Sequence, residues 1–240
     1  MIPAPPALIL TAVCAFTYSF EIVFGLAGTI MMLAALTLFY DAKTLVVYSV
    51  LPQILVGTIG LMRSPRTVRL RFLGGMLAFA AVGGIAGFFL FYHVPGRLFR
   101  ILLATLVTLA GVHLLTGPRK WRLHPAGARV LDTFSGMSQA LFGISGPIAM
   151  TRLLATFNDK TVVRNYALAF FLSLNLLRAT GYLFAHTITP GIARLMLDSG
   201  PFLAVALWFS NHLHFRVKET LFRRVVAWII LASGLSMFVR

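Results

Sequence analysis

The sequence has little charge, few acidic residues and almost no cysteine. Charged residues make up 11 % of the 240 residues, and only 6 residues are Asp or Glu. Since Cys14 stands alone, no intramolecular disulfide can form, which excludes a disulfide-stabilised secreted scaffold. So little polar surface cannot cover a soluble globule of this size, which excludes a cytosolic enzyme. The His, Cys and acidic residues form no cluster with catalytic or ligand spacing, so we expect no enzyme activity, no metal and no cofactor.

What the sequence has in abundance is apolar residues. They make up 59 % of the chain, whose mean hydropathy is +0.89. Most apolar stretches are about 20 residues long, which is one crossing of a hydrocarbon core roughly 30 Å thick. The sequence therefore predicts an all-α integral membrane protein with several spans. The stretches are residues 7–40, 44–62, 72–92, 98–116, 126–157, 162–185, 192–212 and 221–239.

Basic residues outnumber acidic residues by 21 to 6 and give a net charge of +15. Such a charge could indicate nucleic-acid binding. The basic residues instead lie in short runs between apolar stretches, as in the cytoplasmic loops of membrane proteins, so we expect no nucleic-acid partner. Residues 1–6 contain no Lys or Arg, from which we expect no secretory signal and an N-terminus outside the cytoplasm. The runs are Arg63, Arg66, Arg69 and Arg71; Arg119, Lys120, Arg122 and Arg129; and Arg216, Lys218, Arg223 and Arg224.

Two apolar stretches are too long for a single span. A helix over residues 7–40 would measure roughly 50 Å, longer than a whole bilayer with its headgroups. Each long stretch has two glycines near its middle: Gly25 and Gly28 in the first, Gly143 and Gly146 in the second. We therefore expect two helical pieces in each, joined by a tight break that is buried and functional. The simpler alternative is a glycine hinge or close helix packing, which we also expect at Gly83 and Gly87.

The two long stretches resemble each other. At an offset of 118 residues, 8 positions between 24 and 41 are identical, among them both glycines and Asp41 with Asp159. We therefore expect two repeats, residues 1–117 and 126–240, joined by a basic cytoplasmic linker at 118–125. The charge runs place 63–71, 117–129, 158–164 and 214–224 in the cytoplasm and 93–97 and 186–194 outside. The number of membrane crossings agrees with these loop positions if each repeat is a broken re-entrant helical hairpin plus three transmembrane helices. Three crossings per repeat make the repeats inverted, as in transporters that bind substrate at the midplane.

The sequence resembles the TauE/SafE family, also called the sulfite exporter or TSUP family. The resemblance rests on the paired glycine breaks, on Gly143-Ile144-Ser145-Gly146-Pro147, and on the Leu-Phe-Arg motif at 98–100 and 221–223. It implies a multi-pass transporter of the bacterial cytoplasmic (inner) membrane, which moves sulfite, sulfonates or other small organosulfur anions. A passive anion channel of the same architecture is the alternative. A coupling proton or cation and a homodimeric assembly stay open.

The glycine breaks also predict where an anion binds. A half-helix that begins at Gly28 or Gly146 has unpaired backbone N–H groups and the positive end of its dipole at its first residue. Small residues let an anion approach that backbone, and Thr29 and Ser145 add hydroxyl groups. The predicted substrate-binding residues at the breaks are Gly25, Ala27, Gly28, Thr29, Gly143, Ser145 and Gly146.

Arg178 lies deep inside a predicted span, with Asn175 and Tyr182 on the same helix face. A cation at that depth is a candidate functional residue, so Arg178 and Asn175 join the predicted substrate site. Arg178 has two other readings, as a partner of helix carbonyls or as a shallow interfacial residue. For Arg152 we expect a side chain that reaches the cytoplasmic interface.

Glu21 lies in an apolar stretch four residues before Gly25, as Gln139 lies four residues before Gly143. A carboxyl group there could carry a coupling proton, or it could cap the break as a structural group. Asp41 and Asp159 follow the two long stretches and precede the next helices, so we expect both to act as N-caps.

Overall fold

The computed structural model describes residues 7–24, 27–37, 39–62, 68–116, 123–212, 227–228, 230–232 and 234–235. These residues form helices and connecting segments, and no strand occurs among them. The named helices are α1 (Ala7–Phe24), α2 (Gly28–Leu36), α3 (Ala42–Tyr48), α4 (Val50–Met62), α5 (Leu70–His93), α6 (Gly96–Thr116), α7 (Pro125–Phe142), α8 (Gly146–Leu154), α9 (Lys160–Phe184) and α10 (Pro190–His212).

Four helical stretches in the described part of the chain are long and apolar enough to cross a membrane. They are Ala42–Met62, which joins α3 and α4, Leu70–His93, Thr161–Phe184 and Pro190–His212. Large apolar side chains such as Ile85, Phe184 and Phe202 are exposed along these stretches. This is the surface expected of helices that face lipid rather than water.

Both long apolar stretches consist of two helices, as the glycine pairs predict. α1 ends at Phe24 and α2 begins at Gly28, while α7 ends at Phe142 and α8 begins at Gly146. Gly143 follows α7 with a φ of 71°, and its N–H donates to the Gln139 carbonyl at 2.9 Å. A positive φ costs glycine little, so the glycine allows the helix to end there. Gly25 lies outside the described residues.

Corresponding helices of the two stretches begin and end 118 residues apart. The offset holds for the ends of α1 and α7, for the starts of α2 and α8, and for the starts of α3 and α9. The Asp41 carboxylate accepts from the Thr44 N–H at 3.1 Å. The Asp159 carboxylate accepts from the N–H groups of Thr161 and Val162 at 2.8 and 2.9 Å. The predicted N-cap roles of Asp41 and Asp159 are therefore confirmed.

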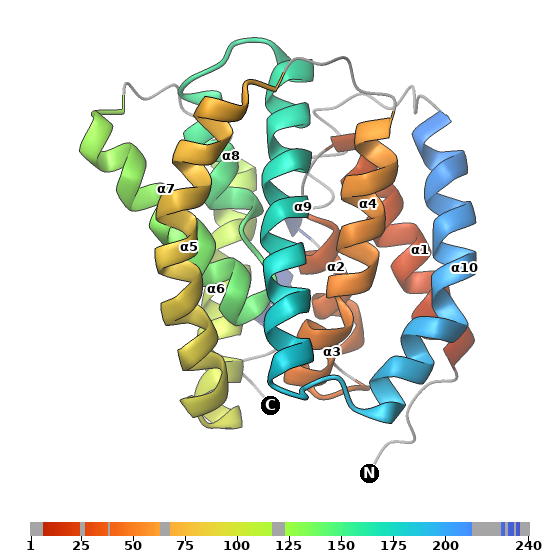
Figure 1. Cartoon of the computed structure of the whole chain (residues 1–240). Coiled ribbons are helices and arrows are strands. Elements are labelled where there is room, and N and C mark those ends of the chain that lie inside the picture. Colours follow the sequence, from red (N-terminus) through yellow and green to blue (C-terminus); the bar gives the residue numbers. More distant parts are fainter. Residues whose placement is uncertain are drawn as a thin grey trace.

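The helices form a bundle in which α5 packs against α7, α1 against α10 and α4 against α9 (Figure 1). α9 also contacts α5, α7 and α8. At Gly83 and Gly87, an added Cβ would overlap the carbonyl oxygens of Thr133 and Met137 on α7. Close packing at these two glycines was predicted, and it lets the backbones of α5 and α7 approach each other.

The helix ends are sorted between the two ends of the bundle (Figure 1). α4 and α10 end where α5 and α9 begin. At the opposite end of the bundle, α5 and α9 end and α10 begins. Of the basic runs, the described members are Arg69, Arg71 and Arg129; the other members lie outside the described residues.

Candidate functional site

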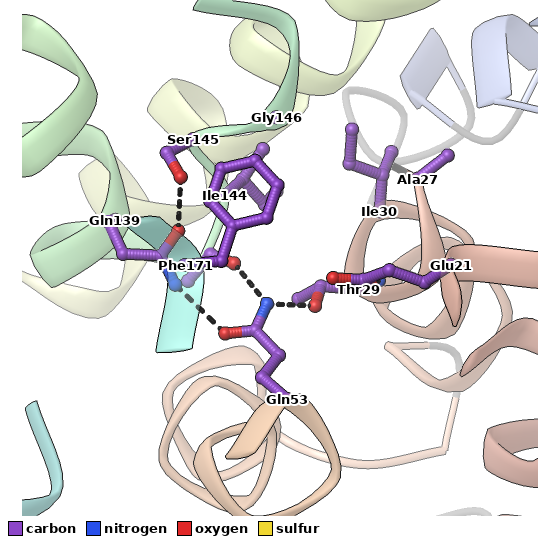
Figure 2. A pocket seen from close by; sticks show the side chains of 11 residues that line it. Glu21, Ala27, Thr29, Ile30, Gln53, Gln139, Ile144, Ser145, Gly146 and Phe171 are labelled. Carbon is purple, nitrogen blue, oxygen red and sulfur yellow. Dashed lines mark hydrogen bonds between the residues drawn. The ribbon is translucent and has the colours of Figure 1, made fainter. Parts of the chain in front are cut away.

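A small pocket lies where the two broken stretches meet. Residues of α1, α2, α4, α7, α8 and α9 and of the segments at the two breaks surround it (Figure 2). Its volume is about 20 Å³, room for about one water molecule. The lining residues are Glu21, Ala27, Thr29, Ile30, Gln53, Gln139, Gly143, Ile144, Ser145, Gly146 and Phe171. Of the predicted site residues, the pocket therefore brings together Glu21, Ala27, Thr29, Gly143, Ser145 and Gly146.

The lining residues come from corresponding positions of the two halves. Pairs separated by 118 residues face the same pocket: Glu21 with Gln139, Ala27 with Ser145, and Gln53 with Phe171. Gln53 was not predicted, although its amide is an unusual group in an apolar stretch. Ile30, Ile144 and Phe171 were also missed, because an apolar side chain within an apolar span gives no signal in the sequence.

The first residue of α8 borders the pocket. Ser145 precedes the helix, and its hydroxyl makes no capping hydrogen bond to α8. The hydroxyl donates instead to Gln139 Oε1 at 2.7 Å. Because Pro147 has no N–H, the free donors of this helix start are backbone groups such as that of Gly146. The positive end of α8 therefore meets the pocket without a side-chain oxygen to cap it.

The first turn of α2 is bonded differently. The Thr29 N–H donates to Glu21 Oε2 at 3.2 Å, and the Glu21 side chain is buried. A Cβ added to Gly28 would overlap that same carboxylate oxygen, so Gly28 faces Glu21 and does not line the pocket. The hydrogen bond from the Thr29 N–H to Glu21 is the contact that a structural cap of the break would make. The Glu21 carboxyl group also borders the pocket.

Three amide side chains form a buried hydrogen-bond network next to the pocket. Gln139 Nε2 donates to Gln53 Oε1 at 2.8 Å and to Asn175 Oδ1 at 3.0 Å. Gln53 Nε2 donates to the Gly143 carbonyl at 2.8 Å and also to Thr29 Oγ1. Figure 2 shows this chain of contacts crossing from Ser145 through Gln139 and Gln53 to Thr29. The network connects the two breaks.

Arg178 lies directly behind the pocket. Its guanidinium donates to Asn175 Oδ1 at 2.8 Å, to Gln53 Oε1 at 3.3 Å and to the Val46 carbonyl at 2.9 Å. A Cβ added to Gly143, which lines the pocket, would be 3.2 Å from both terminal nitrogens of Arg178. Arg178 and Asn175 are thus not lining residues but form the layer behind Gly143 and Gln139.

Arg178 is 3 % exposed and has no acidic partner among the residues that the structure describes. Within the described ranges, the carboxylate that lies within ion-pair distance of an Arg is that of Asp132, which is 3.6 Å from Arg152 Nε. Sequence reasoning missed Asp132, which lies on α7 facing α8. Arg152 is only 16 % exposed, and its guanidinium lies over the Phe72 ring. The expectation that Arg152 simply reaches the interface omitted this ion pair.

A comparison with known protein families matches residues 10–237 to the family described as Sulfite exporter TauE/SafE. The chain belongs to the TauE/SafE family. The match covers nearly the whole sequence and confirms the resemblance carried by the glycine breaks. No curated protein and no solved structure matches the chain.

Membership assigns the general activity. TauE/SafE proteins are transporters rather than enzymes, and their substrates are sulfite or other small anions. Together with the long apolar helices, this makes the TauE/SafE protein described here an integral membrane transport protein.

Proposed function

We propose that this TauE/SafE protein is a secondary transporter that moves a small oxyanion or organosulfur anion, such as sulfite or a sulfonate, across the cytoplasmic membrane. The anion binds in the pocket between the two helix breaks. The observation that carries this proposal is the buried Arg178 guanidinium, which lies behind Gly143 and has no acidic partner among the described residues.

A buried charge without a counter-charge is costly in a medium of low dielectric constant. The oxygens of Val46, Gln53 and Asn175 accept hydrogen bonds from the terminal nitrogens of Arg178 but do not cancel its charge. An anion in the pocket would lie on the other side of Gly143 and would supply the missing negative charge. The uncapped start of α8, at Ser145 and Gly146, adds backbone donors on the same side.

The two halves support a transporter architecture. We propose that residues 1–117 and 126–240 are inverted repeats, joined by the basic segment 118–125. The shared helix boundaries and the pocket residues at equivalent positions favour a duplication. The sorting of helix ends in Figure 1 agrees with hairpins that enter from opposite sides. On this proposal, the basic loops face the cytoplasm and the N-terminus lies outside.

The pocket is small in this conformation, since its volume of about 20 Å³ has room for about one water molecule. Entry of a larger anion therefore requires the surrounding helices to move, as they would in alternating access or in the opening of a gated channel. The dependence of flux on an ion gradient distinguishes the transporter from the channel.

Flux into proteoliposomes tests this proposal. Purified protein should accumulate one or more anions from a panel of sulfite, sulfonates, thiosulfate and carboxylates. For a secondary transporter, the flux should depend on a gradient of a second ion, with a proton gradient as the first candidate because Glu21 borders the pocket. Flux of anions without any coupling would favour the channel, and no flux of any anion would contradict both.

The position of the anion is tested at Gly146, which lines the pocket at the start of α8. In Gly146→Leu, the side chain would occupy the space between the helix start and the anion. Binding should weaken by far more than the ~1 kcal/mol of a helix-propensity change. Gly146→Ala should have the smaller effect of the two. Unchanged affinity in the Leu variant, measured by calorimetry in detergent, would place the anion elsewhere.

A further inference from the structure

The orientation of the pocket amides is fixed by Arg178. A guanidinium has donors only, so the atoms of Gln53 and Asn175 that face it are their oxygens. The Asn175 Nδ2 group correspondingly donates to the Phe171 carbonyl at 2.8 Å. Arg178 thereby sets which end of each amide faces the interior of the network.

This orientation passes on to Gln139. Its Nε2 group donates to the oxygens of both Gln53 and Asn175, which uses both N–H bonds of the amide. Gln139 Oε1 is left to face the pocket side, where it accepts the hydroxyl of Ser145. The Gln53 Nε2 group likewise uses both N–H bonds, on Thr29 Oγ1 and the Gly143 carbonyl.

The polar side chains around the pocket are therefore mainly acceptors. Neither Gln53 nor Gln139 has an N–H bond left for a ligand, and the Ser145 hydroxyl hydrogen is directed at Gln139. On the other wall, Glu21 brings a carboxyl group (Figure 2). The donors that remain for an anion are the backbone N–H groups at the start of α8 and the Thr29 hydroxyl, whose oxygen accepts from Gln53.

We infer that the pocket selects a singly charged oxyanion that carries a hydrogen of its own. Its negatively charged oxygens would meet the start of α8, while its hydrogen would be donated to the acceptor wall formed by Glu21 and Gln139. When Glu21 is ionised, an anion without a hydrogen would leave these acceptors unpaired and would place a second negative charge against the carboxylate. This inference rests on the proposed function, since it names the class of anion that the same site takes.

The other charged or titratable groups near Glu21 do not change this balance. α1 contacts α2, α4 and α10, and neither α2 nor α4 carries a charged side chain. The remaining groups are Cys14 and Tyr18 on α1, of which Tyr18 bonds Thr29; Arg164 on α9, which donates to the Ile22 carbonyl; and, on α10, Arg194 and Asp198, which are exposed, and His212 at the helix end.

Two anions of equal charge and similar shape provide the test. Hydrogen sulfite and chlorate each have three oxygens around a pyramidal centre, but only hydrogen sulfite carries a hydrogen. Their competition against each other is measured with the full-length protein at mildly acidic pH, where sulfite is singly protonated. The wild-type protein should prefer hydrogen sulfite by about tenfold or more, the effect of one unpaired buried acceptor. At mildly alkaline pH, where carbonate is singly protonated, the planar pair hydrogencarbonate and nitrate repeats the comparison with a second shape.

Glu21→Gln offers an amide N–H to the ligand at the same position and removes the carboxyl group. In this variant, the preference should fall towards equality because chlorate gains a donor. The matched control is Asp198→Asn, which neutralises an exposed acid on α10 and should leave the preference unchanged.

Four outcomes would contradict either the proposed anion site or the inference that the pocket selects an anion with a hydrogen. Binding of neither anion in either pair overturns the proposed anion site. Equal binding of both members by the wild-type protein overturns the inference but leaves the transport function intact, and this holds even if Glu21→Gln fails to fold. A preference that survives in folded Glu21→Gln, or that is lost in Asp198→Asn, assigns the selection to another part of the molecule and also overturns the inference.

Discussion

A guanidinium inside a membrane protein is stable only when oxygens or a negative charge surround it. Arg178 has the oxygens, from Val46, Gln53 and Asn175, but its Nε is buried with no partner in the described part of the chain. Of the three roles considered from the sequence, the shallow interfacial one disagrees with a side chain that is 3 % exposed. The other two are compatible, because one guanidinium can hold helix carbonyls and face the anion through Gly143.

Substitution of Arg178 separates charge from geometry. Arg178→Gln should reduce anion binding by well over tenfold, because the counter-charge is lost. Arg178→Lys should retain part of the binding, since the charge remains but the planar fork that orients two amides is lost. Both variants should be compared with wild type in binding assays and in size-exclusion profiles, which report folding. Normal transport by Arg178→Gln would make the residue purely structural.

The Asp132–Arg152 ion pair connects α7 to α8 within the second broken stretch. Loss of one partner leaves the other charge buried, so Asp132→Asn should destabilise the protein by about 3 kcal/mol. The double variant Asp132→Asn with Arg152→Gln should recover part of that loss. Thermal unfolding in detergent measures both effects. Additive losses in the double variant would mean that the two side chains are energetically independent.

Single residues differ in how much the sequence says about them. Asp41 and Asp159 could be assigned as N-caps because they directly precede apolar helices. Glu21 could be recognised as a candidate functional residue because a carboxyl group in an apolar stretch is rare. No pattern in the sequence pairs Asp132 with Arg152, since their contact depends on α8 folding back along α7. The same reason hides Gln53, whose partners Gln139 and Arg178 are far away in the chain.

At the level of helices, small residues determine how closely α5 and α7 pack. A Cβ at Gly83 would overlap the Thr133 carbonyl, and a Cβ at Gly136 on α7 would overlap that of Ala80. These obstacles are backbone atoms, which cannot move away unless the whole helix shifts.

Gly83→Ala should therefore destabilise the protein by about 1–3 kcal/mol, the usual cost of overpacking. Gly74→Ala is the matched control, because Gly74 lies on the same helix and an added Cβ there meets nothing within 4 Å. The measurement is the thermal unfolding midpoint of both variants. Anion affinity of the folded protein should stay unchanged in both, because neither glycine borders the pocket. Equal stability of the two variants would contradict the packing argument.

The helix breaks could be placed from the sequence to within a residue or two. The limit on helix length requires a break, and glycine marks the position where the chain can turn. The sequence places Glu21 and Gln139 at equivalent positions before the two breaks, but it did not indicate how the two helix starts are hydrogen-bonded. The start of α2 bonds the Glu21 carboxyl group, whereas the start of α8 stays without a side-chain cap. That difference arises because Glu21 and Gln139 occupy equivalent positions with different side chains.

For the molecule as a whole, the proposed duplication would explain why one pocket has two similar walls. Helix boundaries recur at an offset of 118 residues, and so do three pairs of pocket residues. Three membrane crossings after each hairpin would reverse the direction of the second repeat. A hairpin that enters from each side would then bring both breaks to the middle of the membrane, where their helix starts can share one anion.

Cysteine labelling tests this topology directly. In a Cys14→Ser background, Ser64→Cys and Thr189→Cys should react with a membrane-impermeant thiol reagent from opposite faces. Ser64 lies in the predicted cytoplasmic segment 63–71, outside the described residues, and Thr189 directly precedes α10. In intact cells, only the Thr189→Cys protein should be labelled, and permeabilised cells should label both. The proposed hairpins and spans require an odd number of membrane crossings between the two positions. Labelling of both positions from one face would therefore refute the inverted arrangement. It would leave the pocket contacts of Glu21, Gln53 and Gln139 as they are.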